Sequence, residues 1–497
     1  MWVLVGLGAA LLCVYALLFP PYTGFDEPQH VDMTLAVQHG EAWPWPGPGE
    51  LPLSLGVAAS SNPVYFGPLS RHPYTNDPYP DHRASLAELG GRAPSAQNYP
   101  NQMVQHPPAF YLMGAGLLAL LPGDADWPYD RVVGVLRLLS IALLVPLPLL
   151  AFHAASRLTA SQPAAVAAAA LSLAIPGLTR VGASVQNDNL LILAASGLLL
   201  GLVRVATGDL TRRTAVAVGL LTALALLSKG FALVLPPVVL LAYALNRRGW
   251  WRSAAVALGV GAVGGSWYLV NLLRFGTLQP EGLGAVADAD FRGPATPGVA
   301  RPLTTYATTV AQTLDRRFWG AIGTPDSPGL SPRVCWLLTA VAVLLAVVAL
   351  VTLKRRLALG MLLLPLPLTL LVVVAGSLPW YRFNGRLPGV QGRYFYPCVL
   401  GLLVVAAVGL VAVLRRRAAW APLLAVLFAL VMQAWALSIV LREYWLPGSD
   451  VAAGIEGIAH WSPWPAAVTV LPFLALVVLA PAALLLVARE PLRRASP

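Results

Sequence analysis

Apolar segments long enough to cross a membrane recur along the chain, and they constrain its fold more than any other feature. Hydrophobic residues make up 57% of the 497 residues and charged residues only 11%, which is far from the composition of a soluble domain. Because a helix of about 20 apolar residues spans a bilayer, we predict an all-α polytopic membrane protein with about twelve transmembrane helices. The spans are expected near residues 2–20, 132–154, 163–179, 188–206, 214–228, 230–245, 253–273, 333–353, 357–379, 395–414, 418–441 and 466–488.

The segment at residues 107–122, PPAFYLMGAGLLALLP, is apolar but short. If it were a full span, either the loop before it or every basic cluster after it would change sides of the membrane. We therefore expect an interfacial or re-entrant helix here. A count of thirteen spans, with this segment included, is the alternative.

Basic residues set the predicted orientation. The net charge of +11 would suggest a nucleic-acid partner in a soluble protein, but here Lys and Arg lie in short clusters between apolar runs, so we expect no nucleic-acid partner. The positive-inside rule places these clusters, and with them both termini, in the cytoplasm. The clusters are Arg212-Arg213, Arg247-Arg248, Lys354-Arg355-Arg356, Arg415-Arg416-Arg417 and Arg493-Arg494.

The acidic residues are distributed in the opposite way. With twelve spans, only Asp209 and Glu490 of the 22 acids remain cytoplasmic, and half of the acids lie in the first outer loop, residues 21–131. Acids hardly influence insertion, so this asymmetry indicates polar chemistry outside the membrane. The loop is also rich in proline and aromatic residues, and we expect it to form a packed cap with short juxtamembrane helices. The other predicted outer loops are 274–332, 380–394 and 442–465.

Lys229 is the most informative of the polar residues at the outer ends of the spans. The apolar runs before and after it are about 15 residues each, or about 22 Å of helix, against a hydrocarbon core of about 30 Å. Their shared turn should therefore lie below the outer surface, where a lysine costs a few kcal/mol unless it is paired. Either Asp188 or Asp26 pairs with it structurally, or it binds a phosphate anion, which Gly230 would allow to approach the backbone.

Asp26 and Glu27 follow the first span directly. Asp26 could simply cap a helix or mark the interface. Alternatively, a carboxylate held at the membrane rim can act as a general base and accept a proton from an attacking hydroxyl. Glu27 could support Asp26 or serve as the base itself. We therefore treat both acids as candidate catalytic residues.

Four further residues are candidates for substrate binding, each with a simpler alternative. Asp188, which opens the fourth predicted span, could instead be only the structural partner of Lys229. His30 lies one turn after Asp26, but one histidine with two acids is weak evidence for a metal, so we expect no cofactor and keep a divalent cation as a minor alternative. His106 precedes two prolines and could mark a helix start. Arg393 lies in an aromatic segment and could snorkel to the interface instead of binding phosphate or sugar.

Several short motifs resemble those of the GT-C superfamily of integral-membrane glycosyltransferases. FDE, at residues 25–27, stands where that superfamily carries its catalytic acid, just after the first span. The segment LLSKGF, at residues 226–231, resembles one in the aminoarabinose and protein mannosyl transferases. The chain resembles more narrowly a bacterial family of predicted polytopic proteins related to these enzymes. This narrower resemblance rests on DEPQH followed by HG, and on QHPPAFY, QNDNLL and GRYFYP.

The resemblance implies an inverting transfer of a sugar from a polyprenyl-phosphate donor to a glycan or lipid-linked acceptor of the cell envelope, outside the cytoplasmic membrane. Asp26 would be the catalytic acid, and Lys229 and Arg393 would neutralise the departing phosphate. Residues 1–280 would form the catalytic membrane module. Residues 281–497 would contain the second outer loop and variable C-terminal helices.

A transporter or flippase of a lipid-linked sugar is the main alternative. Transporters tend to show internal repeats and ionisable residues deep within spans. No repeat is evident here, and the interiors of the predicted spans are almost free of acids. A non-catalytic membrane scaffold would leave the depth of Lys229 unexplained. The sequence therefore favours the transferase.

Overall fold

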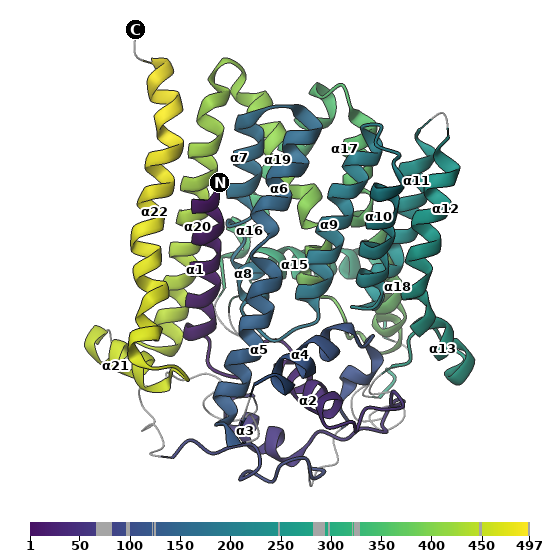
Figure 1. Ribbon diagram of the computed structural model, residues 1–497, viewed down its shortest axis with the longest axis vertical. Coiled ribbons are helices and arrows are strands. Elements are labelled where there is room, and N and C mark those ends of the chain that lie inside the picture. The colour runs from purple at the N-terminus through teal and green to yellow at the C-terminus, as the bar shows by residue number, and fades with distance from the viewer. Residues whose placement is uncertain are drawn as a thin grey trace.

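The computed structural model describes residues 1–65, 82–95, 100–121, 123, 126–246, 249–281, 294–296, 299–320, 322, 329–446 and 450–495. Within these ranges the secondary structure consists of helices, with three isolated β-bridges and no strands. The prediction of an all-α polytopic membrane protein is therefore confirmed. Figure 1 shows a bundle of long helices whose lower end is covered by the short helices of the first loop.

Seven helical runs in the described ranges are long and apolar enough to cross a membrane, or eight when the bent pair α7–α8 is counted as one span. This count is lower than twelve, mainly because several predicted spans are short or run together. Helix α1 (Trp2–Leu18), α10 (Arg212–Leu226) and the pair η5–α11 (Gly230–Val234, Leu235–Ala244) are short helices at predicted spans. One continuous run, Gly392–Tyr444, contains two predicted spans. Each of the twelve predicted segments is thus mainly helical.

The remaining helices of the bundle follow the predicted order. Helix α9 begins at Asp188, the first residue predicted for the fourth span. The bounds are α5 (Tyr129–Leu144), α6 (Leu147–Thr159), α7 (Gln162–Leu171), α8 (Pro176–Gly182), α9 (Asp188–Ala206), α12 (Trp250–Gly261), η6 (Ala262–Gly265), α13 (Ser266–Phe275), α15 (Leu303–Trp319), α16 (Pro332–Thr352), α17 (Arg356–Leu363), α18 (Pro365–Asn384), η7 (Gly392–Cys398), α19 (Val399–Leu414), η8 (Arg415–Trp420), α20 (Ala421–Tyr444), α21 (Val451–Trp461) and α22 (Ala466–Ala495).

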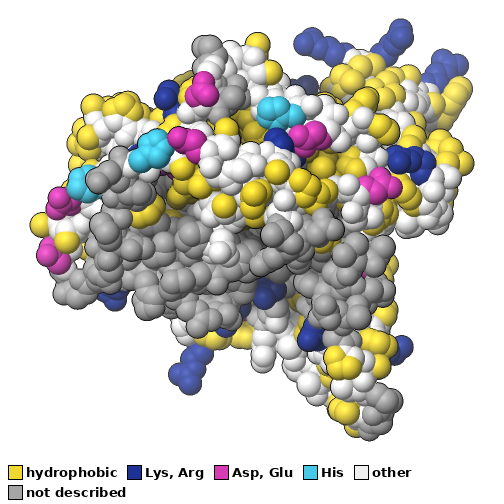
Figure 2. All heavy atoms as spheres, turned by 90° about the horizontal axis from the view of Figure 1, so that it is seen from below, with side chains coloured by type: hydrophobic (Ala, Val, Ile, Leu, Met, Phe, Trp, Pro, Cys, Tyr) yellow, Lys and Arg dark blue, Asp and Glu magenta, His cyan; other side chains and the backbone are white. Residues whose placement is uncertain are grey.

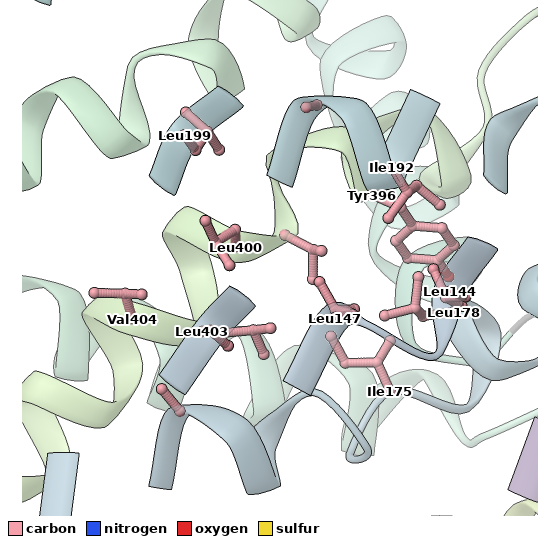
Figure 3. Close-up of a cluster of buried hydrophobic side chains, with 14 of the residues drawn as sticks. Leu144, Leu147, Ile175, Leu178, Ile192, Leu199, Tyr396, Leu400, Leu403 and Val404 are labelled. Carbon is pink, nitrogen blue, oxygen red and sulfur yellow. The ribbon is translucent and has the colours of Figure 1, made fainter. Parts of the chain in front are cut away.

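Small residues allow the central helices to pack closely. Helix α7 contacts α6, α19 and α20, and alanines on it are fully or almost fully buried. A side chain on Gly401 of α19 would collide with the carbonyl of Leu362. Such close backbone approach is typical of membrane helix interfaces. Around it, branched side chains from α5–α9 and α19 fill the core, including Leu147, Ile175 and Leu400 (Figure 3).

Packing crosses the boundary that was expected near residue 280. The first helix, α1, lies against α22 and also contacts α20. The ends of α1 and α22 nearest the two termini point to the same side of the bundle, away from the cap (Figure 1). The early and late helices therefore share one core.

The first loop forms the predicted cap. It contains α2 (Glu27–Gln38), α3 (Leu55–Tyr65), η3 (Gln102–Gln105) and α4 (Ala109–Ala119). Helix α4 has 11 residues, or about 16 Å of helix against a core of about 30 Å, so it cannot cross the bilayer by itself. It packs on α2, and its first amide, at Ala109, donates to the carbonyl of Leu227 at 3.1 Å.

A buried carboxylate holds the cap together. Asp32 is fully buried and accepts hydrogen bonds from the Ser54 hydroxyl at 2.5 Å and from Asn101 Nδ2 at 2.9 Å. Arg92 also pairs with Asp32 and reaches Glu41 at 2.6 Å. These bonds join segments far apart in the sequence. Seen from the cap side, acidic side chains and histidines lie among apolar ones on the described surface (Figure 2).

Candidate active site

Asp26 occupies a sharp turn between the first span and the cap. Pro20 and Pro21 follow α1, and Asp26 takes a left-handed backbone conformation, φ 55°, before α2 begins. Such a conformation is uncommon for residues other than glycine and is often found at functional sites. The Asp26 side chain is 28% exposed. Its Oδ1 accepts a hydrogen bond from Gln102 Nε2 at 3.1 Å, and its Oδ2 accepts one from Arg393 Nη2 at 2.8 Å.

Glu27, the adjacent acid, has a different environment. Its side chain is fully buried, and Arg137 of α5 donates to both of its carboxylate oxygens, at 2.9 and 2.7 Å. The amides of Gly24 and Val185 donate to the same carboxylate at 3.1 and 2.9 Å. Arg137 also donates to three carbonyls of the first span and the residues after it, those of Ala16, Phe19 and Pro20. The pair thus locks the end of α1 against α5.

A row of alternating charges extends from Asp26 into the bundle. Arg393, in η7, lies 3.8 Å from Asp188 through its Nε, and Asp188 accepts a hydrogen bond from Lys229 Nζ at 2.8 Å. Asp188, Lys229 and Arg393 are all buried. The structural ion pair that the sequence left open for Lys229 is therefore present, and its partner is Asp188. It belongs to the same network as Asp26.

Lys229 lies where the short helices predicted it, in the turn between α10 and η5. Its ammonium group lies 5.1 Å from the centre of the Tyr394 ring, and a cation at this distance is attracted by the ring. Arg393 likewise lies over Phe25, at 4.7 Å. The space beside Gly230 is occupied by the side chain of Gln279, so the expected approach of a head group to Gly230 would require this side chain to move.

The two predicted histidines stack beside this row. The rings of His30 and His106 are 6.3 Å apart and nearly parallel, and His30 Nδ1 lies 3.0 Å from the Tyr111 hydroxyl. Burial, followed by the positive charges of Lys229 and Arg393, lowers the pKa of both histidines well below the ordinary value. They are therefore neutral at pH 7 and can exchange hydrogen bonds with a polar ligand.

The arrangement contains residues that the sequence analysis did not select. Gln102 binds Asp26, and Tyr111 binds His30. Arg180 is almost fully buried, lies 4.4 Å from the Phe25 ring and donates to the carbonyl of Thr23 at 2.6 Å. Its position inside an apolar segment is the one sequence signal that could have identified it, because an intramembrane arginine is a functional hypothesis by default.

Several buried polar atoms of this region have no hydrogen-bond partner among the described residues. They are Gln186 Nε2, Asp188 Oδ2, Arg393 Nε and His106 Nδ1. Native proteins leave few such groups, because each costs about 1–3 kcal/mol. Their gathering beside Asp26 indicates a place for a polar ligand. In the part of the chain that the structure describes, no group of three His, Cys, Asp or Glu residues is arranged to hold a metal ion.

Comparisons with known proteins agree with the resemblance. Residues 105–270, about one third of the chain, match the family model of dolichyl-phosphate-mannose-protein mannosyltransferases. The match includes His106, Asp188 and Lys229, and it confirms the resemblance to GT-C membrane glycosyltransferases that the motifs indicated. No curated protein sequence matches the chain.

Three solved structures that match the chain are distant from it in sequence. ArnT from Cupriavidus metallidurans, in the apo state, has 14% identity and a TM-score of 0.47 over 97% of this chain and 77% of that one. The same protein bound to undecaprenyl phosphate has 14% identity and a TM-score of 0.46, over 99% and 75%. The apo oligosaccharyltransferase of Archaeoglobus fulgidus has 14% identity and a TM-score of 0.42, over 93% and 56%.

Proposed function

We propose that this protein is an inverting glycosyltransferase that moves a sugar from a polyprenyl-phosphate donor to an extracytoplasmic glycan or lipid-linked acceptor. The observation that carries the proposal is the continuous row from Asp26 through Arg393 and Asp188 to Lys229. It joins a partly exposed carboxylate to two buried cations. Proton acceptance and phosphate binding are the two tasks that such a transfer requires.

In the proposed reaction, Asp26 accepts the proton of the acceptor hydroxyl. The hydroxyl oxygen attacks the anomeric carbon of the sugar on the face opposite the phosphate, and the bond between that carbon and the phosphate oxygen breaks. The configuration is inverted, and the electron pair leaves with the polyprenyl phosphate. Because no covalent sugar–enzyme intermediate forms, one essential carboxylate is sufficient.

Lys229 and Arg393 are proposed to neutralise the negative charge of the leaving phosphate. Lys229 has three N–H donors and Arg393 has five, and both already lie against carboxylates. An incoming phosphate would share these cations with Asp26 and Asp188. Nε of Arg393 faces Asp188 at 3.8 Å without a hydrogen bond, so it is a donor that could turn to the phosphate, and a fixed donor of this kind needs little reorganisation as charge develops.

The other candidates take supporting roles in the proposal. Glu27 is proposed as a positioning residue, because its two oxygens are already occupied by Arg137 and by two amides. His30 and His106 are proposed to bind sugar or acceptor hydroxyl groups as neutral rings. The site is proposed to work without a metal ion.

The proposed site faces away from the cytoplasm. Three of the basic clusters lie at the end of the bundle opposite the cap (Figure 1). They are Arg212-Arg213 at the start of α10, Lys354-Arg355-Arg356 at the start of α17 and Arg415-Arg416-Arg417 in η8. The positive-inside rule assigns that end, and both termini with it, to the cytoplasm. The Arg247-Arg248 cluster lies outside the described residues.

The test is sugar transfer in membranes that contain either the wild-type protein or Asp26→Asn. Labelled polyprenyl-phosphate sugars would serve as donors, and the native envelope would supply the acceptors. We expect Asp26→Asn to reduce transfer by roughly 10²–10⁴-fold, the usual effect of a general base. Asp209→Asn, the same change at the opposite end of the bundle, is the matched control. Unchanged transfer by a well-expressed Asp26→Asn protein would remove Asp26 as the base, and an effect of EDTA would contradict the metal-free mechanism.

A further inference from the structure

A second site lies on the other side of the Glu27–Arg137 pair. A cavity of about 260 Å³ opens between α1, α5, the end of α20 and the start of α22. Its walls are mostly apolar and include Leu17, Val133, Leu138 and Ile141. No residue of the row from Asp26 to Lys229 lines it. We call this cavity the tryptophan groove, because Trp445, Trp461 and Trp464 line it as well.

The position of the tryptophan groove determines what can fill it. Its lining comes from the last turns of α1, most of the length of α5 and the first turns of α22. Tryptophans concentrate where a bilayer meets water, so the groove lies at the outer edge of the hydrocarbon core. An apolar cavity of this kind does not hold water well. A hydrocarbon chain from the outer leaflet is therefore its natural occupant.

One end of the groove is polar. Asp130 lines it, and Arg83 of the cap donates to Asp130 Oδ2 at 3.0 Å. Arg83 also donates to the carbonyls of His460 and Ser462, both at 2.7 Å. These bonds attach the cap to the segment that carries Trp461 and Trp464. This arrangement is complementary to a lipid. The hydrocarbon chain would lie in the apolar groove, and the polar head group would lie beside the charged pair on the water side.

The groove shares one residue with the surroundings of the candidate base. Arg137 lines the groove, and the same guanidinium holds Glu27, the residue next to Asp26. Lys229 and Arg393, the proposed phosphate ligands, come from α10–η5 and η7 instead. Figure 1 shows α1, α20 and α22 on one side of the bundle and α10–α12 on the other. Two lipids could therefore approach Asp26 from different sides.

We infer that the tryptophan groove holds the hydrocarbon chain of a lipid-anchored acceptor, while the polyprenyl-phosphate donor binds on the Lys229 side. The inference rests on the proposed function and narrows it, because it selects a lipid-linked acceptor over a free polysaccharide. Anchoring the chain beside Arg137 limits where the acceptor head group can lie. The attacking hydroxyl is thereby kept close to Asp26. The reaction between donor and acceptor then behaves as an effectively unimolecular step, which lowers its entropic cost.

The first experiment measures binding and requires no turnover. The full-length protein in lipid nanodiscs is irradiated with one of two probes, a phospholipid with a diazirine in one acyl chain or a polyprenyl phosphate with a diazirine in its last isoprene. Labelled peptides are then mapped by mass spectrometry. We expect preferential labelling of segments 133–141 and 461–472 by one of the probes. Equal labelling of all lipid-facing helices would overturn the inference, because it would show bulk lipid only.

Matched variants separate the groove from the general lipid surface. Leu138→Trp fills the groove, whereas Leu220→Trp makes the same change on the lipid-facing side of α10, where Leu220 is 58% exposed. Loss of about two buried methylene groups predicts a roughly tenfold decrease in groove labelling for Leu138→Trp. Leu220→Trp should leave it unchanged. Ala16→Phe, a filling change from α1, provides a second variant should Leu138→Trp fold poorly.

The variant Lys229→Met, which removes a proposed contact to the donor phosphate, distinguishes which lipid supplies the hydrocarbon chain in the groove. Polyprenyl labelling of the groove that persists in Lys229→Met would identify an isoprenoid acceptor, and acyl labelling would identify an acyl lipid acceptor. Polyprenyl labelling that disappears in Lys229→Met would assign the groove to the donor and overturn the inference.

In transfer assays, Leu138→Trp should raise KM for a lipid acceptor about tenfold without changing KM for the donor. If groove labelling succeeds while no donor supports transfer, the proposed function fails and the lipid groove stands.

Discussion

Asp26 and Glu27 are adjacent acids of the same turn, yet they differ in burial and in hydrogen bonding. Glu27 is fully buried and its carboxylate accepts four hydrogen bonds, two of them from Arg137. Asp26 keeps 28% of its side chain exposed and belongs to a row of charges with unpartnered polar atoms. A closed ion pair fixes geometry, whereas an open one can exchange partners with a substrate. The comparison predicts different losses when each network is broken.

The largest effect on stability is expected at the closed pair. Glu27→Gln leaves the Arg137 guanidinium buried beside a neutral amide, and breaking a buried pair in this way costs about 3–5 kcal/mol. We expect a lower melting temperature in detergent and less folded protein in the membrane. Asp26→Asn should melt close to the wild type. If Glu27→Gln folded normally but lost transfer, Glu27 would have a direct catalytic role and the contrast between the two acids would disappear.

Lys229 should affect the reaction more than the fold. Lys229→Met keeps the length and apolar stem of the side chain but removes the charge, so the leaving phosphate loses one electrostatic partner. We expect kcat to fall by roughly 10²–10³-fold, the usual effect of losing one preorganised stabilising group. Donor binding measured by labelling should weaken as well. Normal kcat with a lower melting temperature would show that the Lys229–Asp188 pair is only structural.

The sequence predicted the open network, the row from Asp26 to Lys229, better than the closed Glu27–Arg137 pair. Asp26, Asp188 and Lys229 follow or open apolar runs, so their positions at span ends are visible without a structure. The two short runs around Lys229 also predicted a turn at this residue correctly, since Lys229 lies between α10 and η5 and is buried. These properties depend on local length and polarity. Such local properties can be read from a single sequence without a structure.

The partners of these residues could not be predicted in the same way. Gln102 meets Asp26 across 76 residues, and Arg137 meets Glu27 across 110. The first contact depends on how the cap folds over the turn after α1 and the second on how α5 packs beside that turn, and no local pattern specifies either arrangement. The lengths of the individual helices were also not predictable: α1 and α10 are shorter than a full span, so only seven or eight described runs meet the length and composition criterion for crossing a membrane.

The histidines beside the open network should make stability depend on pH. Burial and the nearby Lys229 and Arg393 charges lower the pKa of His30 and His106 in the folded protein, while the unfolded chain has the ordinary value of about 6.5. The unfolded state then binds more protons below that pH, so the free energy of unfolding falls by up to about 1.4 kcal/mol per pH unit for each histidine. Melting temperatures between pH 7.5 and 5.5 would measure this decrease. A His30→Gln, His106→Gln double variant should show a flatter profile, and an equally steep one would assign the dependence to other groups.

The smallest expected effect tests whether Arg393 acts by charge alone or by geometry. Its planar guanidinium reaches Asp26 with Nη2 and faces Asp188 with Nε at the same time. A lysine keeps the charge but concentrates it at one point and cannot bridge two carboxylates in a fixed geometry. We therefore expect Arg393→Lys to reduce transfer by about three- to tenfold, or about 1 kcal/mol, and Arg393→Met to reduce it further. Equal losses in the two variants would mean that bridging matters more than charge. Full activity of Arg393→Lys would mean that the positive charge alone suffices. The open network would then tolerate a change of geometry, whereas we expect the closed Glu27–Arg137 pair not to tolerate one.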